Sequence, residues 1–314
     1  MKVLYNIFRK FFLIKKFKRA RVPTKEKTMY QIICNPVAGR KRAAKNLRVV
    51  EKILTERGIE YKVHQSCDVH DAEDIARKLT QAGETEFLVL GGDGTLNEVL
   101  NGLADPSVCR IGLIPSGTGN DFAGRRGISL DPEKALMRVL EGEAQPIDYI
   151  DVSGTRCMNV AGLGIDVDVL VRCQKGKMKG KLKYLFSLMK SLFAYKGCRV
   201  KIVSEGKEET RNVLICAACN GSQFGGGIKI CPPAREDDGM MDIVLVDCIG
   251  GAWKIVKAFV QLMKGKIVDY PLTTYFRCEK VEFIPDEAAP IQLDGEVYQN
   301  HAFEAKICKG LKFY

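Results

Sequence analysis

The sequence has no apolar stretch that approaches the roughly 20 residues of a membrane-spanning helix. The longest candidate, residues 184–195, is interrupted by Lys190 and by serines. Paired Cys/His finger spacing, a basic zipper and an aromatic-rich RNA-binding motif are also missing. The three histidines, His64, His70 and His301, are scattered, and we assign them no catalytic role. These absences argue against a membrane-spanning protein and against a nucleic-acid binder.

The net charge of +11 is concentrated in two segments. Residues 1–27 carry ten Lys/Arg and a single acid, Glu26, and residues 172–201 carry ten Lys/Arg and no acid. The net positive charge of these two segments together is larger than that of the whole chain, so the rest of the chain carries a net negative charge. This distribution fits attachment to an anionic surface better than a broad nucleic-acid groove. We therefore expect an anionic membrane surface as a partner, and no nucleic acid.

Both basic segments leave two interpretations open. In the basic amphipathic arm, residues 1–27, phenylalanines alternate with cations and no small-residue cleavage site follows, so the arm is either an interfacial helix or a disordered basic tail. The predicted helix over 181–195 mixes lysines with large apolar residues. Its apolar face either contacts acyl chains or packs in the core.

Several of the twelve cysteines lie in contexts that predict core packing rather than metal or disulfide chemistry. Cys34, Cys216 and Cys219 lie inside apolar, strand-like runs, where cysteine is usually a small buried hydrophobe. CAAC, at 216–219, is the only CxxC, and neither a second pair nor a nearby histidine completes a zinc site. A reducing cytoplasm is the simplest setting. We expect a cytoplasmic protein that associates peripherally with the inner face of the plasma membrane.

The first half of the chain alternates predicted strands with predicted helices. The strands cover 29–36, 59–66, 87–92 and 110–115, and the helices cover 43–57, 71–82 and 97–104. This alternation predicts a parallel sheet in a Rossmann-like α/β domain. Ligands bind such sheets beyond the carboxyl ends of the strands. NPVAG, GGDGT and PSGTGN all lie there, and their backbone amides suit a polyphosphate.

From residue 146 onward the runs become short and strand-like, which predicts an antiparallel sheet pair or a barrel-like sandwich. We therefore expect three parts: the arm at 1–27, a nucleotide-binding α/β domain at 28–148, and a β-sandwich lipid-binding domain at 149–314. Whether the last strand returns to the first domain stays open. The chain lacks GxxxxGK[ST] and a GxGxxG with a ribose-binding acid, which argues against a P-loop enzyme and a plain dinucleotide dehydrogenase.

Five motifs occur in order: NPVAG at 35–39, GGDGTLNEV at 91–99, IPSGTGNDFA at 114–123, DDGMMDIVLV at 237–246 and LDGE at 293–296. In these motifs the chain resembles the diacylglycerol kinase catalytic family, in particular the bacterial soluble lipid kinases, over about 29–314. The resemblance implies an α/β domain joined to a β-sandwich, with the active site in the cleft. It also implies an ATP- and Mg²⁺-dependent lipid kinase, with diacylglycerol as the lipid substrate and phosphatidic acid as the product.

The resemblance also implies roles for individual residues. Glu296 corresponds to the proposed general base, and Asp93 lies where Mg²⁺ and the phosphates meet. Asp294, two residues before Glu296, points the same way if the strand is extended, and would bind metal or support Glu296. From spacing alone, Asp294-Gly295 is instead a hairpin turn. The implied ATP-binding residues are Asn35, Pro36, Val37, Ala38, Gly39, Ser66, Gly91, Gly92, Asp93, Gly94, Thr95, Leu96, Asn97 and Thr118.

Two further features follow from the resemblance. A structural Mg²⁺ is implied at the Asp238 carboxylate and the backbone carbonyls of Arg235 and Met240, where a plain acidic turn is the alternative. A charged network is implied between the domains. Its matching positions are Arg40, Asp121 and Asp148, and Gly124 replaces the family's arginine, beside Arg125 and Arg126.

Three alternative functions stay open at this point, and so does a homodimer. The first is kinase activity on another lipid, such as a sphingoid base, phosphatidylglycerol or a polyprenol. The second is an NAD kinase, which shares GGDGT, although NDFA and LDGE argue against it. The third is a non-catalytic nucleotide-binding membrane regulator, against which the intact Asp93, Asp294 and Glu296 speak.

Overall fold

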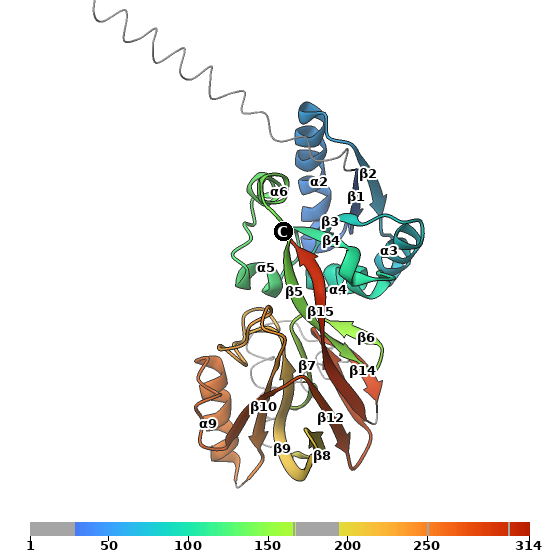
Figure 1. The fold of residues 1–314 in the computed structure, drawn as a ribbon. Helices are drawn as coiled ribbons and strands as arrows, with labels where there is room; N and C mark the ends of the chain where they lie inside the picture. The colour runs from blue at the N-terminus through green and yellow to red at the C-terminus, as the bar shows by residue number, and fades with distance from the viewer. Residues whose placement is uncertain (1–28, 166, 168–194, 250, 301) are drawn as a thin grey trace, which may run out of the picture.

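The computed structural model describes residues 29–165, 167, 195–249, 251–300 and 302–314 (Figure 1). The basic arm at 1–27 and nearly all of the helix expected at 181–195 lie outside the described residues. Among the helices that the structure describes, none is both long enough and apolar enough to cross a membrane.

The first half is an α/β unit, as the alternating pattern predicted. Its parallel strands lie in the order β4-β3-β1-β2, and helices pack on the sheet (Figure 1). The elements are β1 (Tyr30–Cys34), α2 (Ala38–Arg57), β2 (Tyr61–Gln65), α3 (Asp71–Gln81), β3 (Glu86–Gly91), α4 (Asp93–Gly102), η2 (Pro106–Val108), β4 (Arg110–Pro115), α5 (Asp121–Arg125) and α6 (Pro132–Glu141).

Local chemistry explains several of these boundaries. β1 and β3 are buried along their whole length, which matches their continuous apolar runs. α2 ends where Gly58 adopts the left-handed conformation, and α6 begins at Pro132 behind Asp131, whose carboxylate accepts hydrogen bonds from the N–H groups of residues 133 and 134. The expected start of α4 at Asn97 was wrong, because the helix begins four residues earlier, at Asp93, inside the Gly-rich motif.

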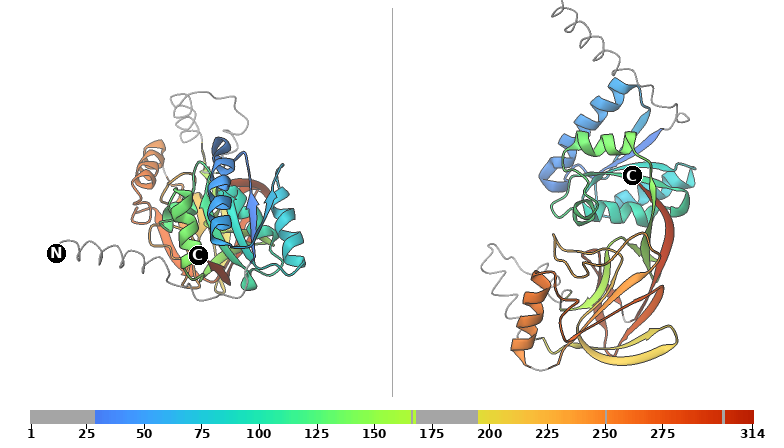
Figure 2. Two further views of the ribbon diagram at one scale, coloured as in Figure 1. Left: turned by 90° about the horizontal axis from the view of Figure 1, so that it is seen from above. Right: turned by 60° about the vertical axis from the view of Figure 1, so that its left-hand side comes forward.

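The second half is dominated by antiparallel strands, in agreement with the predicted sandwich. One helix, α9, lies on its outer side (Figure 2). The elements are β5 (Gln145–Val152), β6 (Thr155–Cys157), β7 (Val160–Gly164), β8 (Cys198–Ser204), β9 (Lys207–Cys219), β10 (Met241–Asp247), α9 (Ala252–Met263), β11 (Thr273–Cys278), β12 (Lys280–Pro285), β13 (Ala289–Leu293), β14 (Glu296–Asn300) and β15 (Phe303–Phe313).

β15 joins the two halves. It pairs antiparallel with β12 and β5, and its end pairs parallel with β4 through Lys312 and Phe313 (Figure 1). A bulge between Cys308 and Leu311, with Gly310 at φ 100°, bends the strand between these partners. The ring of Phe313 lies 4.7 Å from that of Phe122 in α5.

Buried apolar side chains form three clusters. The first fills the α/β half, the second lies within the β-rich half, and the third lies between its strands β9 and β10 and helix α9. Cys34, Cys216 and Cys219 are fully buried in these clusters, so the expectation of core packing is confirmed.

Candidate active site

The Gly-rich motifs lie at the carboxyl ends of adjacent parallel strands. Residues 35–39 follow β1, Gly92 and α4 follow β3, and residues 116–120 follow β4. Ser66 follows β2, and its N–H donates to the carbonyl of Cys34 at the end of β1 (2.9 Å). The parallel sheet thus brings these motifs to one edge, where such sheets bind their ligands.

Several of the glycines in these loops are required by close packing of the protein against itself. A Cβ atom on Gly117 would lie 2.4 Å from the Cα of Gly92, and one on Gly39 would lie 1.9 Å from the carbonyl oxygen of Ser116. Gly39 also has φ 56°, which favours glycine. In contrast, Gly94 has only the Glu296 carboxylate within 4 Å, at 3.8 Å from its added Cβ. The motifs therefore contain structural glycines and a glycine that opens onto polar groups.

Side chains that the sequence analysis did not single out hold the loops together. Arg42 in α2 donates to the carbonyl of Gly117 (3.1 Å), and Asn46, one turn later, donates to the hydroxyl of Ser116 (2.9 Å). The Asn120 side chain accepts from the N–H of Gly117 (2.9 Å) and donates to its carbonyl (3.0 Å). The i, i+4 spacing of Arg42 and Asn46 on one helix face was the available signal.

Asp93 begins α4 and lies against the start of α5. Its carboxylate accepts hydrogen bonds from the backbone N–H groups of Asp121 (3.0 Å) and Phe122 (3.1 Å). Burial raises the pKa of Asp93, the charges of Asp121 and Asp294 add to that rise, and the two hydrogen bonds oppose it. Asp93 is thus a fixed, half-buried acid with unused lone pairs, which fits a role beside a cation or phosphate.

Asp294 occupies a tight hairpin turn, so the expectation of an extended strand at this position was wrong. Asp294 has φ 52° and Gly295 has φ 91°, and Leu293 pairs directly with Glu296 across the turn. Both turn residues therefore have the positive φ of the preferred Asp-Gly hairpin turn. The spacing-based alternative, a turn pair, is the one that forms.

The Asp294 carboxylate binds protein groups on several sides. It accepts from the N–H groups of Met158 (2.6 Å), Asn159 (2.8 Å) and Val160 (3.1 Å). It also accepts from the Asn97 amide (3.2 Å) and the Cys157 thiol (3.2 Å). With these donors around it, Asp294 holds the hairpin against α4 and the start of β7. Its geometry favours support of Glu296 over direct contact with a metal.

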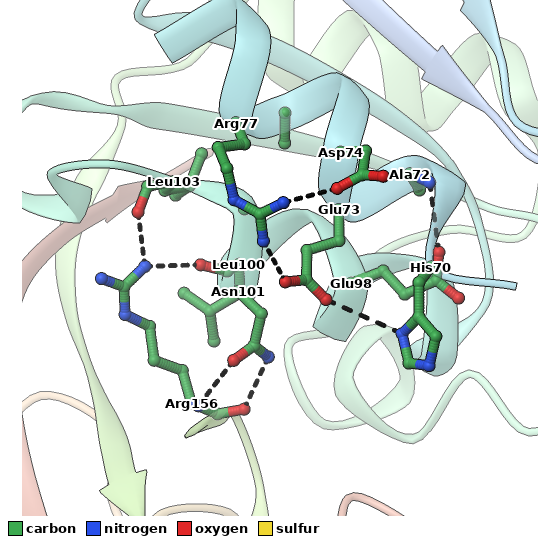
Figure 3. Close-up of polar contacts among 12 residues, drawn as sticks. His70, Ala72, Glu73, Asp74, Arg77, Glu98, Leu100, Asn101, Leu103 and Arg156 are labelled. Atoms are coloured by element: carbon green, nitrogen blue, oxygen red, sulfur yellow. Dashed lines mark hydrogen bonds and ion pairs between the residues drawn. The ribbon is translucent and has the colours of Figure 1, made fainter. Parts of the chain in front are cut away.

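Arg156 fixes the other end of α4 (Figure 3). Its guanidinium donates to the carbonyls of Leu100 (2.9 Å) and Leu103 (2.6 Å) at the C-terminus of the helix, where carbonyls lack the usual intrahelical partners. Its backbone N–H donates to the Asn101 side chain (2.7 Å), which donates in turn to the Arg156 carbonyl (2.9 Å). α4, which carries Asp93, is therefore held at both ends.

The Glu296 carboxylate is exposed and faces the first turn of α4, where Gly94 provides the open space. Within the described part of the chain, it makes no hydrogen bond or ion pair. Glu296 and Asp93 thus lie at the same end of α4, and both carboxylates keep lone pairs for a ligand, those of Asp93 beside its two backbone hydrogen bonds.

Comparison with known proteins shows the family of the chain. The model of the diacylglycerol kinase catalytic domain matches residues 29–152, and that of the YegS C-terminal NAD kinase beta sandwich-like domain matches residues 159–310. A protein named diacylglycerol kinase from Bacillus subtilis is 30% identical over 270 residues, which cover 85% of this chain and 89% of that protein. The chain belongs to the diacylglycerol kinase catalytic-domain family. It is a lipid kinase, and the family implies ATP as its phosphoryl donor.

A second relative agrees with this assignment, and a solved structure has the same fold. A probable YegS-like lipid kinase from Xanthomonas campestris is 33% identical over 217 residues, which cover 66% of this chain and 70% of that protein. The crystal structure of a putative diacylglycerol kinase from Bacillus anthracis superposes with a TM-score of 0.75 at 23% identity, over 92% of this chain and 97% of that one. The latter likeness establishes the two-part fold of this lipid kinase.

The two halves of the lipid kinase are linked through α5. The Asp121 carboxylate accepts from the N–H of Gly226 (2.7 Å) and from the Gln223 amide (3.2 Å). At the other end of the helix, Arg125 and Arg126 both form ion pairs with Glu236. The structure pairs both arginines beside Gly124 with an acid that the sequence analysis missed.

Asp148 and Arg40, the other residues of the expected charged network, do not join the described contacts of α5. The Asp148 carboxylate accepts from the N–H of Gly239 (2.7 Å), and its own N–H donates to the carbonyl of Glu236 (2.6 Å). Arg40 is exposed with φ 60°. Asp148 therefore braces the loop that carries Glu236, whereas Arg40 and the exposed Thr118 lie where a ligand has access.

The predicted structural metal loop is held by ion pairs. Asp238 pairs with Arg277 and accepts from the N–H of Met240 (3.2 Å), and Arg235 donates to Asp237 (3.1 Å). Among the described residues, no group of three or more His, Cys, Asp or Glu side chains is arranged to hold a metal. A set of one carboxylate and two backbone carbonyls is nevertheless hard-oxygen chemistry that fits Mg²⁺. The Mg²⁺ assignment stays a prediction.

Proposed function

We propose that this lipid kinase transfers the γ-phosphoryl group of ATP to the hydroxyl group of diacylglycerol, with phosphatidic acid and ADP as products. The observation that carries the proposal is the meeting of Asp93 and Glu296 at the N-terminal end of α4. Glu296 comes within 3.8 Å of an added Cβ on Gly94, the residue after Asp93. One half of the molecule thus contributes the half-buried acid Asp93, and the other contributes the exposed carboxylate of Glu296.

The nucleotide phosphates bind, in this proposal, at the edge formed by residues 35–39, the first turn of α4 and residues 116–120. The N–H groups in the first turn of α4 and the positive end of its helix dipole favour an anion there. Bound Mg²⁺ would neutralise charge on the β- and γ-phosphates. The carboxylate oxygens of Asp93 and Asp121 have the donor chemistry to hold it. A second Mg²⁺ at Arg235, Asp238 and Met240 would brace the loop that follows Glu236.

Glu296 is the proposed general base. Its carboxylate accepts the proton of the lipid hydroxyl as the oxygen attacks the γ-phosphorus, and the bond to the leaving ADP oxygen breaks. A base of this kind contributes about 10²- to 10⁴-fold. Asp294 is a positioning residue, since it fixes the turn from which Glu296 projects. Catalysis rests mainly on positioning and on electrostatic stabilisation.

The lipid acceptor implies work at a membrane surface. We propose peripheral attachment to the anionic inner face of the plasma membrane, supported by the surplus of Lys/Arg in residues 1–27 and 172–201.

The test is transfer of ³²P from ATP to a panel of lipids in mixed micelles with Mg²⁺. The wild type is compared with Asp93→Ala and with Asp286→Ala, which removes an exposed carboxylate. Labelled phosphatidic acid from the wild type and Asp286→Ala, but not from Asp93→Ala, is the expected result. Label on a different lipid would replace diacylglycerol as the acceptor. Formation of NADP, or ATP binding without transfer to any lipid, would overturn the proposal.

A further inference from the structure

Helix α9 stands on the outer side of the β-rich half and has two distinct faces (Figure 1 and Figure 2). Its inner face, formed by Ile255, Ala258 and Leu262, packs in the third apolar cluster. Its outer face exposes Trp253 (77%), Val260 (40%) and Met263 (57%). Large apolar side chains gathered on one exposed helix face are unusual for a surface that faces only water.

The same outer face is strongly basic. Lys257 and Lys264 fall on one helix face with Trp253 and Val260, at the spacing i, i+4, i+7, i+11. Lys254 and Lys266 lie nearby, and no Asp or Glu occurs from residue 248 to residue 268. Among the described lysines, Lys52, Lys201, Lys280 and Lys309 form ion pairs. The four lysines at α9 form none within the described residues, so their charges are not neutralised by a neighbouring acid.

The combination of exposed apolar side chains and unneutralised lysines indicates what binds to the outer face of α9. Two copies of the chain meeting through α9 would bring eight lysines together with no acid between them, so charge opposes a dimer here. An anionic lipid bilayer matches both the lysines and the exposed apolar side chains of α9. Lysines bind lipid phosphates, and tryptophan and aliphatic side chains enter the boundary between headgroups and acyl chains.

The contacts behind α9 lead toward the active site. Phe224 and Ile230 belong to the same apolar cluster as Ile255 and Leu262. On either side of Phe224, Gln223 and Gly226 donate hydrogen bonds to Asp121, the residue whose N–H binds Asp93. α9 therefore shares an apolar cluster with the loop whose Gln223 and Gly226 bind Asp121.

We propose that the outer face of α9 is a membrane-docking surface that lies on anionic lipid, with Trp253, Val260 and Met263 inserted at the headgroup boundary. The proposal rests on the proposed function, because a kinase for membrane lipids must reach its substrate in the bilayer. It assigns the contact to residues of the folded β-rich half. The basic arm at 1–27 is not needed for it.

The sequence supplies a reporter for this face, because Trp253 is the only tryptophan of the chain. Full-length protein is titrated with phosphatidylcholine vesicles and with vesicles that contain phosphatidylglycerol. We expect the Trp253 emission to shift to shorter wavelength, and to be quenched by brominated acyl chains, with the anionic vesicles only. Sedimentation of the protein with vesicles while the emission stays unchanged would mean that another segment binds, and would overturn the proposal.

Charge reversal separates α9 from the rest of the surface. Lys257→Glu with Lys264→Glu is compared with Lys45→Glu and Lys134→Glu, which change the net charge equally at exposed positions in α2 and α6. Each basic contact is worth about fivefold in vesicle affinity, so the α9 pair should lose about 25-fold or more. Equal losses in both pairs would contradict a specific docking face. Trp253 emission that is already short in wavelength, together with a dimer in solution, would make the face an interface between copies.

Kinase assays distinguish this proposal from the proposed function. The α9 pair should lose phosphorylation of diacylglycerol embedded in anionic vesicles and keep that of a short-chain diacylglycerol dispersed below its micelle concentration. If the wild type phosphorylates no lipid but Trp253 still inserts, the docking surface stands and the kinase proposal fails. If the wild type phosphorylates lipids while Trp253 stays in water, the docking proposal fails alone.

Discussion

The side-chain amide of Asn97 donates a hydrogen bond to the carboxylate of Asp294 across 3.2 Å. This bond connects α4, which carries Asp93, to the hairpin that carries Glu296. The backbone of residues 158–160 and the carbonyl of Arg156 reinforce the connection, because the former bind Asp294 and the latter accepts from Asn97 (3.1 Å). Asp294 thus fixes the positions of the two proposed catalytic acids, Asp93 and Glu296, relative to each other.

Removal of this third acid should affect stability first. Asp294→Ala deprives three partly buried N–H groups and the Asn97 amide of their acceptor, so the free energy of unfolding should fall by about 3 kcal/mol. Urea unfolding measures the change, with the exposed Asp286→Ala as the control. If Asp294→Ala unfolded at the wild-type urea concentration yet had no activity, Asp294 would act directly in the chemistry.

Glu296 should show the opposite behaviour. Its carboxylate is exposed and makes no hydrogen bond or ion pair with the described residues, so Glu296→Gln should leave the melting temperature within about 1 °C of wild type. Loss of the base should lower kcat by about 10²- to 10⁴-fold. Glu287→Gln, at an exposed position before β13, should retain full kcat. A Glu296→Gln enzyme with wild-type kcat would exclude the proposed base.

Asp93→Asn should lower kinase activity and raise the stability of the protein at neutral pH. Burial raises the pKa of Asp93 above its usual 3.8, so the charged form is less favourable in the folded protein than in the unfolded chain. This penalty is present above the raised pKa, and it disappears as the pH falls through that pKa to below 3.8. Without nucleotide, Asp93→Asn should therefore melt above wild type at pH 7, and the difference should shrink toward pH 4. A difference that grows on acidification would contradict the prediction.

Glu236 should be worth far more than a surface acid. Its removal leaves the largely buried Arg125 and Arg126 without their shared counter-charge, so Glu236→Ala should lose about 3 kcal/mol in the free energy of unfolding. Glu279→Ala, which breaks an exposed pair with Lys309, should lose less than about 0.5 kcal/mol. Adding Arg125→Met to Glu236→Ala should recover part of the loss. No recovery in this double variant would mean that the arginines are neutralised elsewhere.

The effect of replacing a glycine with alanine should depend on the space around that glycine. Gly117→Ala places a Cβ 2.4 Å from the backbone of Gly92, so the loops must move apart and ATP binding should weaken at least tenfold. Gly124→Ala meets only the end of the Gln223 side chain, at 3.7 Å, and should be tolerated. Isothermal titration with a non-hydrolysable ATP analogue compares the two. Equal ATP affinity in both variants would show that the loop contact does not matter for binding.

Local patterns in the sequence were enough for the strands, most helices and the edge at which the motifs gather. α3, expected at 71–82, runs from Asp71 to Gln81, because its apolar spacing and the acids in its first turn are local signals. The start of α4 was missed, since glycines usually lower the probability of a helix, and here Gly92 lies directly before the helix against Gly117 while Gly94 lies in its first turn.

The long-range partners could not be predicted. Arg126 and Glu236 are 110 residues apart, and neither the arginine pair nor the acid is marked by a period or a motif. The same applies to Asp294 and residues 158–160, whose contact depends on how β13 pairs with β7. Such contacts are products of the folded topology. The sequence contains the groups but not the geometry that joins them.

The position of β15 has a consequence for folding during synthesis. β4 keeps one edge unpaired until β15 has been made, because β15 is the strand that pairs with that edge and it follows all the other strands in the chain. An unpaired edge can pair with another chain. The edge of β4 in the nascent α/β half therefore stays exposed while the whole β-rich half is translated. Chaperone dependence and aggregation of this kinase should be governed by how quickly β15 arrives.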